Sequence, residues 1–192
     1  SDQRLSPYQL PSIDPECLDS QNNGKKSLWQ HTPIEKKAAV GIIFTCPQNH
    51  KQEHTEIILT RRSQKVATHK GQISFPGGKA EPSEKSPEAT AIREITEEIN
   101  IPVSSMTTHT VLKPVKSYWG MIVWPVVITA ADFIHQLKKS HEVEDIIFAP
   151  WTDFHHSYDN SFSMKQGHAT GRSYYYAIKG SFIWGLTAHI LK

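Results

Sequence analysis

Short apolar runs separated by polar stretches predict a sheet of several strands. Residues 38–44 (AAVGIIF) form one continuous apolar run, which is typical of a buried strand. After a polar connection, EIILT at 56–60 predicts the return strand of a hairpin. Further strands are expected at 107–113, 121–129 and 172–178.

The clearest helix signal in the chain covers residues 87–99. Ser86 suits the N-cap, and Pro87 suits the first helical position. Asn100 tolerates the left-handed conformation with which many helices end, and Pro102 follows it. These local signals predict both ends of the helix.

Two weaker helical patterns are expected at 131–139 and, as a closing amphipathic helix, at 181–191. Residues 1–37 are rich in Pro, Ser, Asn and Asp, which predicts an N-terminal arm or a loosely packed segment before a domain at 38–192. Hairpins mixed with a few helices, rather than regular βαβ units, predict the α+β class with a mixed sheet.

Composition excludes several function classes. The net charge of +2 over 192 residues lacks the strong basic excess of a nucleic-acid binder. The apolar runs are too short to span a bilayer, and no signal peptide is visible. Cys17 and Cys46 do not make a disulfide framework, so we expect a reducing, cytoplasmic location. There is no CxxC, HExxH or Walker-type motif.

Glutamates gather on one side of the predicted helix. At about 100° per residue, Glu94, Glu97 and Glu98 fall opposite a stripe of three isoleucines. Like charges three or four residues apart destabilise a helix, and a divalent cation reverses that effect. Mg²⁺ and Mn²⁺ prefer such oxygen ligands, although a merely solvated acidic face is the alternative.

The segment before the helix has the opposite charge. Residues 61–70 carry four basic side chains and no acid, whereas residues 81–98 carry six glutamates against Lys85 and Arg93. A glycine turn at Gly77-Gly78 joins the two segments. Cations that hold phosphate oxygens, beside carboxylates that hold a metal, are what a metal–phosphate site needs.

These residues resemble the Nudix box, which reads Gly, five residues, Glu, seven residues, then Arg-Glu-aliphatic-x-Glu-Glu-x-Gly-aliphatic. Here Gly78 is followed after five residues by Glu84 and after eight more by the run REITEEINI (93–101). The second spacer therefore has one extra residue, and Asn100 stands in place of the last glycine.

The preceding segment, LTRRSQKVATHKGQISFPGG (59–78), resembles the one that marks the coenzyme A pyrophosphatase branch of this family, which also has the longer spacer. The matching positions are Arg62, Ser63, His69, Gly71, Gln72, Phe75, Pro76, Gly77 and Gly78. Residues 65–67 depart from the Leu-Arg that the branch often shows before its His. Segments 113–127, 140–150 and 182–191 resemble later parts of the branch.

The resemblance implies the Nudix fold, a mixed sheet between helices with the box as loop–helix–loop. It also implies metal-dependent cleavage of a pyrophosphate, for this branch in coenzyme A or a derivative, giving 3′,5′-ADP and 4′-phosphopantetheine. Another Nudix specificity, such as ADP-ribose, and a non-catalytic ligand-binding regulator are the alternatives. The regulator is disfavoured because the box glutamates are all present. A homodimer is left open.

The resemblance also implies roles for individual residues. Metal ligands for Mg²⁺ or Mn²⁺ are expected from Glu94, Glu98, Glu97 and the carbonyl of Gly78. Arg93 is expected to orient a carboxylate, and Glu84 either pairs with the loop or assists a second metal.

Contacts with the substrate are expected from Arg62, His69, Gln72 and Gly77. The general base stays open between a box glutamate and Glu142. Three aromatic residues either stack on the substrate or belong to the core: Tyr118, Trp119 and Trp151.

Overall fold

A mixed β-sheet lies between helices in the computed structural model, which describes residues 28–45, 55–66, 70–155, 161–166, 169–178 and 180–192. The main sheet has the strand order β3 (Ile73–Ser74), β2 (Glu56–Arg62), β1 (Lys37–Thr45), β7 (Ile122–Ala130), β5 (Met106–Val111). Three more strands pair with this path: β4 (Gly77–Lys79) with β1, β6 (Val115–Lys116) with β7, and β8 (Val143–Pro150) with β2. Only β1 and β7 pair in parallel among the described strands.

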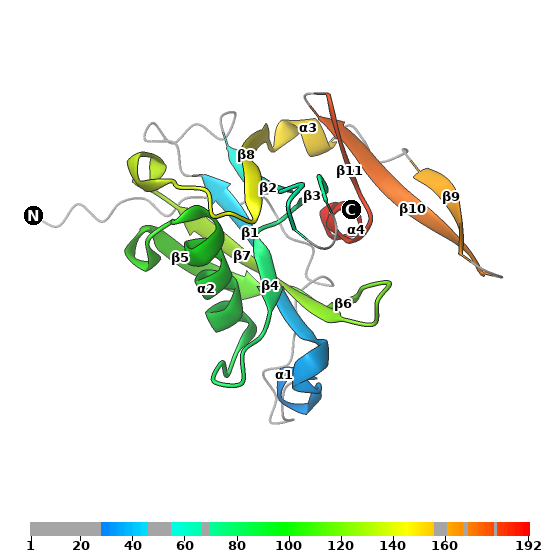
Figure 1. Cartoon of the computed structure of the whole chain (residues 1–192), viewed down its shortest axis with the longest axis horizontal. Helices are drawn as coiled ribbons and strands as arrows, with labels where there is room; N and C mark the ends of the chain where they lie inside the picture. Colours follow the sequence, from blue (N-terminus) through cyan, green and yellow to red (C-terminus); the bar gives the residue numbers. More distant parts are fainter. Residues whose placement is uncertain (1–27, 46–54, 67–69, 156–160, 167–168, 179) are drawn as a thin grey trace, which may run out of the picture.

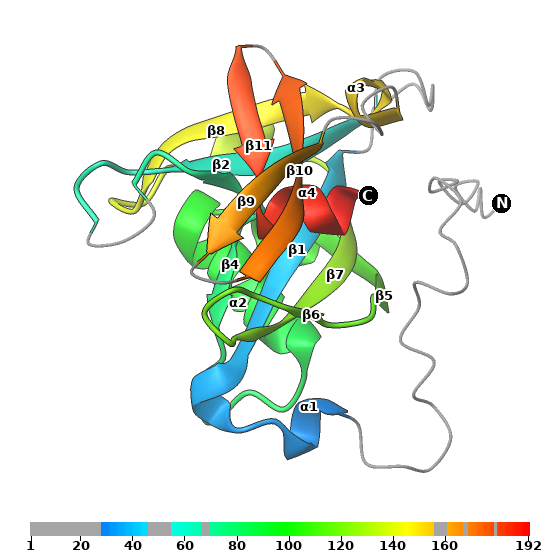
Figure 2. The same cartoon turned by 90° about the vertical axis from the view of Figure 1, so that its right-hand side faces the viewer.

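The sheet is covered on both faces, which confirms the predicted α+β sandwich (Figures 1 and 2). Helix α2 (Pro87–Ile99) buries Ala91, Ile95 and Ile99 against one face of the sheet. On the other face, α4 (Leu186–Leu191) buries Ala188 and Leu191 in a second apolar cluster. At roughly 1.5–3 kcal/mol for each fully buried large aliphatic side chain, these two clusters hold α2 and the sheet in fixed positions.

The remaining elements are short or lie at the edge of the molecule. Among the residues that the structure describes, short 3-10 helices occur at Ile34–Lys36, Val103–Ser105 and Ile134–Gln136. Short helices α1 (Leu28–His31) and α3 (Thr152–His155) precede β1 and follow β8. A second sheet of β11 (Ser181–Trp184), β10 (Ala169–Ile178) and β9 (Ser161–Gln166) lies beside the main one.

The structure confirms the local signals of α2. The Ser86 hydroxyl accepts a hydrogen bond from the N–H of Ala89 at 3.3 Å, and Pro87 is the first helical residue. Asn100 adopts the left-handed conformation with φ 58° and ends the helix. The strands predicted around 38–44, 56–60, 107–113, 121–129 and 172–178 are also present, within a few residues at each end.

Two helix predictions were correct only in part. At 181–191, Ser181–Trp184 instead forms β11, because these residues pair antiparallel with β10, and the positive φ of Gly185 (69°) allows a helix only after it. At 131–139, Asp132 has φ 54° and only the 3-10 turn Ile134–Gln136 forms. In both segments a residue in the left-handed region interrupts the helical pattern.

Residues 28–36 pack on the domain, although they belong to the expected N-terminal arm. Trp29 is 2% exposed and meets Trp124 of β7 edge to face, with ring centroids 4.9 Å apart. Residues 1–27, the rest of the expected arm, lie outside the described residues.

Candidate active site

The glycine pair on β4 brings the sheet close to α2. A Cβ atom at Gly77 would collide with the carbonyl oxygen of Ala39 on β1, and Gly77 has φ 154°. A Cβ atom at Gly78 would lie 2.5 Å from Oε1 of Glu94. Gly77 therefore needs glycine, whereas a side chain at Gly78 would push the Glu94 carboxylate aside, because that carboxylate rests directly on the backbone of β4.

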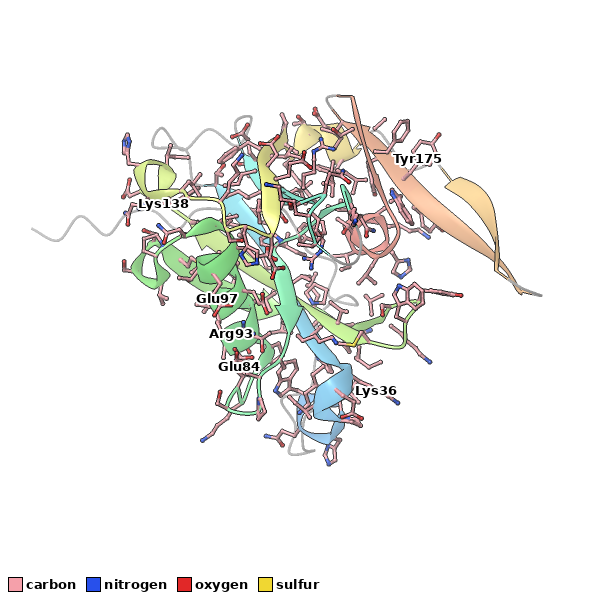
Figure 3. All side chains as sticks on the ribbon, in the orientation of Figure 1. Lys36, Glu84, Arg93, Glu97, Lys138 and Tyr175 are labelled. Carbon is pink, nitrogen blue, oxygen red and sulfur yellow. The ribbon has the colours of Figure 1, made fainter. Side chains whose placement is uncertain are left out.

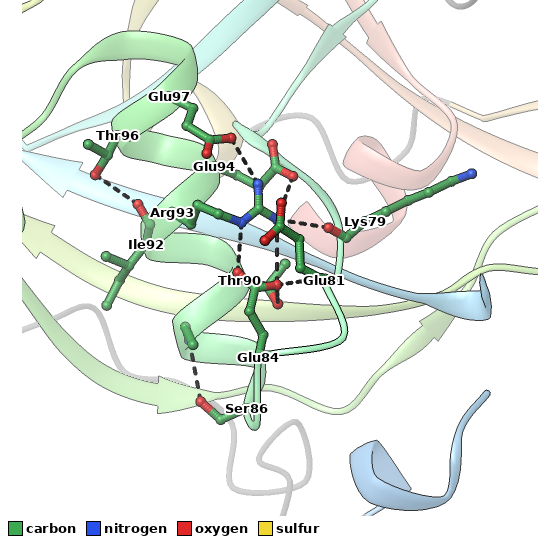
Figure 4. A network of polar contacts seen from close by, with 11 residues as sticks. Lys79, Glu81, Glu84, Ser86, Thr90, Ile92, Arg93, Glu94, Thr96 and Glu97 are labelled. Carbon is green, nitrogen blue, oxygen red and sulfur yellow. Dashed lines mark hydrogen bonds and ion pairs between the residues drawn. The ribbon is translucent and has the colours of Figure 1, made fainter. Parts of the chain in front are cut away.

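Arg93 is the centre of a polar network on the side of α2 (Figure 4). Its Nε donates to Oε1 of Glu84 at 2.7 Å, and its Nη1 donates to Oε2 of Glu97 at 2.8 Å. Its Nη2 lies 2.9 Å from the carbonyl oxygen of Lys79 and 3.0 Å from Oε1 of Glu94. One guanidinium thus connects β4, the loop between β4 and α2, and two glutamates of α2. Figure 3 shows Glu84, Arg93 and Glu97 along that side of the helix.

Glu84 is held from several directions. Its Oε2 accepts from the backbone N–H of Glu81 and from the hydroxyl of Thr90, each at 2.7 Å. Burial alone would raise the pKa of Glu84, but the hydrogen bonds from Arg93, Glu81 and Thr90 and the charge of Arg93 outweigh it and lower the pKa. Burial likewise opposes the charge of Arg93, yet its carboxylate partners raise the pKa of its guanidinium. The pair therefore stays ionised.

Glu98 and Glu94 form the buried part of the acidic helix. Glu98 is only 8% exposed, and burial, with the charge of Glu94 next, raises its pKa to about 8. The backbone N–H of Gly77 donates to the Glu98 carboxylate, but Oε2 of Glu98 has no hydrogen-bond partner. Burial also raises the pKa of Glu94, against the opposing effect of Arg93. Two neighbouring carboxylates are thus short of positive charge.

Arg62 and Glu142 border this acidic cluster. Nη2 of Arg62 lies 3.2 Å from Oε2 of Glu142, where β2 pairs with β8 and the register shifts between Arg61 and Arg62. The backbone N–H of Ser63 donates to the carbonyl oxygen of Glu142 at 2.8 Å. The charge of Arg62 lowers the pKa of Glu98, and that of Glu142 raises it. Both side chains are therefore within electrostatic range of the buried pair.

The cluster fits a divalent cation, on the evidence of its donors. Oε2 of Glu98 is a buried, unpartnered carboxylate oxygen beside the partly buried carboxylate of Glu94, which is the situation that a cation relieves. Among the described residues, however, no group of three or more His, Cys, Asp or Glu side chains could hold an ion. Mg²⁺ commonly takes only one or two carboxylates together with water and phosphate oxygens, so Glu94 and Glu98 satisfy its needs.

The structure separates Glu97 from the two buried glutamates, although all three were expected to share a face. The side chain of Glu97 is 58% exposed, and its carboxylate pairs with Arg93. Glu98 is one residue further along the helix, about 100° round it, and is buried, whereas Glu97 stays at the surface with Arg93.

Gln72 follows the loop of the β2–β3 hairpin, with its carbonyl oxygen 2.9 Å from the backbone nitrogen of Arg62. A Cβ atom at Gly185, before α4, would lie 3.7 Å from Nε2 of Gln72. His69 lies outside the described residues.

Of the three candidate aromatic residues, Trp151 packs with Phe44 and Phe154 at the edge of the second apolar cluster. Tyr118 and Trp119 are 65% and 73% exposed, and their rings meet edge to face at 4.9 Å.

Sequence reasoning missed Thr90. It is fully buried, and its hydroxyl lies against Glu84. Its three-residue spacing from Arg93, which places both side chains on one face of the helix, was the available signal.

An α+β sandwich with neighbouring carboxylates on an acidic helix is the arrangement for which comparisons with known proteins identify the family. A family model described as NUDIX domain matches residues 35–170. The chain is 36% identical over 140 residues to "Uncharacterized Nudix hydrolase NudL" of Photorhabdus laumondii, covering 70% of this chain and 73% of the relative. It is 35% identical over 166 residues to the protein of the same name from Yersinia enterocolitica, covering 81% and 77%.

Among solved structures, a Caenorhabditis elegans Ap4A hydrolase in a binary complex has a TM-score of 0.50 at 21% identity, covering 60% of this chain and 81% of that chain. This likeness shows the fold. The chain belongs to the Nudix family, and it is a Nudix hydrolase, which acts on a nucleoside diphosphate derivative. Enzymes of this family generally use divalent metal ions. Within the described part of the chain, none of the helices is both long and apolar enough to span a membrane.

Proposed function

We propose that this Nudix hydrolase cleaves the pyrophosphate linkage of coenzyme A or a derivative, and releases 3′,5′-ADP and 4′-phosphopantetheine or its acyl form. One observation supports the proposal most. The segment that resembles the coenzyme A branch, residues 59–78, runs through β2, β3 and β4, and its Arg62 lies within electrostatic range of the buried Glu98. The branch-specific residues thus border the box glutamates.

In this proposal Glu94 and Glu98 hold one Mg²⁺ or Mn²⁺, with the carbonyl of Gly78 beside them, whereas Glu97 stays paired with Arg93 and is not a ligand of this ion. The bound ion would supply acidity to a coordinated water and neutralise phosphate charge. Arg93 does not contact the substrate; it orients Glu94 through the 3.0 Å contact and anchors β4 through Lys79.

Arg62 binds the diphosphate of the substrate, since it is a cation at the open side of the cluster. Gln72 and the backbone of Gly77 contact the same region, with His69 assigned to the substrate by resemblance alone. Glu142 is the preferred general base because its side chain is 41% exposed and its carboxylate is held beside the cluster by Arg62, while the N–H of Ser63 fixes the Glu142 backbone through its carbonyl oxygen. A base near the site contributes typically 10²–10⁴-fold to such a reaction.

Substrate profiling tests the proposal. The purified chain is incubated with Mg²⁺ and either coenzyme A, ADP-ribose or a nucleoside triphosphate, and the products are identified by mass. We expect coenzyme A to give the highest kcat/KM. A clear preference for ADP-ribose or the triphosphate would reject the assigned branch while leaving the family membership intact.

Gln72→Ala tests the branch-specific segment. This variant should lower kcat/KM for coenzyme A more than for a generic dinucleotide, because Gln72 is proposed to contact coenzyme A and not the dinucleotide. The control is Gln64→Ala, since Gln64 is an exposed glutamine on the same loop. Equal losses on both substrates would remove Gln72 from substrate selection.

A further inference from the structure

Thr90 occupies a position in α2 from which it can act on the site without touching it. The residue is 0% exposed and lies on the same face of the helix as Arg93, one turn earlier. Its hydroxyl donates to Oε2 of Glu84 at 2.7 Å, and no solvent competes for that hydrogen bond.

Glu84 depends on Thr90 for part of its fixed orientation. The Glu84 side chain is only 9% exposed, and its Oε2 accepts from Thr90 and from the N–H of Glu81, while its Oε1 accepts from Arg93. Loss of the hydroxyl would leave Oε2 with the N–H of Glu81 as its one close donor and a longer contact of 3.5 Å to Nη2 of Arg93, so the plane of the carboxylate that Arg93 meets would be less firmly fixed.

Arg93 passes this orientation on to the acidic cluster. Its guanidinium is planar, so the hydrogen bond from Nε to Glu84 sets the direction of the other two nitrogens. Those nitrogens meet Glu97, Glu94 and the carbonyl oxygen of Lys79. The carboxylate of Glu94 in turn lies against Gly78. A chain of short contacts therefore runs from Thr90 to a proposed metal ligand.

We infer that Thr90 is a positioning residue, whose hydroxyl locks Glu84 and, through Arg93, sets Glu94 for binding the divalent ion. The inference rests on the metal-binding role of Glu94 and Glu98 proposed above, and it is independent of the choice of coenzyme A as substrate.

The test compares Mn²⁺ binding to the ion-free protein by electron paramagnetic resonance, together with kcat and KM on coenzyme A or, if that is not cleaved, on the best substrate of the profile. Thr90→Val keeps the side-chain shape and removes the donor, and Thr90→Ser restores it. Partners behind metal ligands typically contribute about 10–100-fold to affinity or activity. We therefore expect Thr90→Val to weaken Mn²⁺ binding and lower kcat by about tenfold or more, with little change in KM, and Thr90→Ser to recover most of both.

Thr96→Val is the matched control. Thr96 lies on the same helix, but its hydroxyl donates to the backbone carbonyls of Ile92 and Ile101 rather than to the network. It should leave Mn²⁺ affinity near that of the wild type. Equal loss in Thr96→Val, or unchanged Mn²⁺ affinity and kcat in Thr90→Val, would overturn the inference.

Glu84→Gln keeps the inference testable if Thr90→Val does not fold. This variant should weaken Mn²⁺ binding by a similar factor, and unchanged affinity would overturn the inference. Failure of the wild type itself to bind Mn²⁺ would instead overturn the proposed metal site. Glu98→Gln removes a proposed ligand directly, so it distinguishes failure of the metal site from failure of the Thr90 inference.

Discussion

Replacing Glu98 with glutamine gives a prediction that needs no substrate. The variant keeps the size of the side chain but stays neutral, as Glu98 does when protonated. Burial raises the pKa of Glu98 from 4.5 to about 8. Between these values the native state holds the proton and the unfolded chain has released it. Raising the pH therefore favours unfolding, by at most about 1.4 kcal/mol per pH unit for one proton.

The magnitude follows from the size of the shift. A difference of about 3.5 pKa units corresponds to on the order of 5 kcal/mol between pH 4.5 and 8. Rotation of the Glu98 carboxylate toward solvent lowers this free-energy difference, so the value given is an upper limit. The free energy of unfolding of Glu98→Gln, relative to the wild type, should therefore rise steadily with pH. At pH 4.5 and below, this contribution is nearly absent because both states are protonated.

Urea unfolding in EDTA at pH 5, 6, 7 and 8 measures this difference. The control, Glu88→Gln, removes a charge from the first turn of the same helix. Adding Mg²⁺ at pH 8 should then stabilise the wild type by about 2.7 kcal/mol when the ion is at 100 times its Kd, and should stabilise Glu98→Gln by less. A stability difference between wild type and variant that does not change with pH would refute the reasoning.

Three further predictions concern other parts of the site. Gly78→Ala places a Cβ atom against Glu94 and should lower both kcat and, by about 1–3 kcal/mol, the free energy of unfolding; unchanged kinetics would contradict the close approach. Ser86→Ala removes the N-cap of α2 and should cost about 1 kcal/mol in chemical denaturation without changing KM, so a purely kinetic effect would be unexpected. Glu142→Gln should lower kcat, yet bind ADP more tightly in calorimetry, because Arg62 no longer has to leave an ion pair; weaker binding of ADP would argue against Arg62 as the phosphate contact.

The parts of the site that follow from local signals were predictable. Helix α2 begins after Ser86 and ends before Asn100 as expected, since its caps depend on neighbours in the chain. The order Gly78, Glu84, Arg93 likewise indicated the family, because the box is contiguous in sequence. Signals between residues close together in the sequence were therefore enough to predict the fold class and the family.

Features that depend on distant residues were not predictable. Burial of Glu98 requires β4 to lie against α2, and the pairing of Arg62 with Glu142 joins positions 80 residues apart. The segment Ser181–Trp184 has an amphipathic helical pattern, yet pairing with β10 makes it a strand. In each case tertiary contacts, which no local window contains, decided the outcome.

In the proposed function, Glu94 and Glu98 hold a divalent ion for cleavage of coenzyme A. The most direct measurement is a mass analysis of coenzyme A incubated with Mg²⁺ and either the wild type or Glu98→Gln, after both are shown to be folded. The account predicts 3′,5′-ADP and 4′-phosphopantetheine from the wild type and a rate lower by orders of magnitude from the variant. Intact coenzyme A with the wild type, or equal rates from the two proteins, would contradict it.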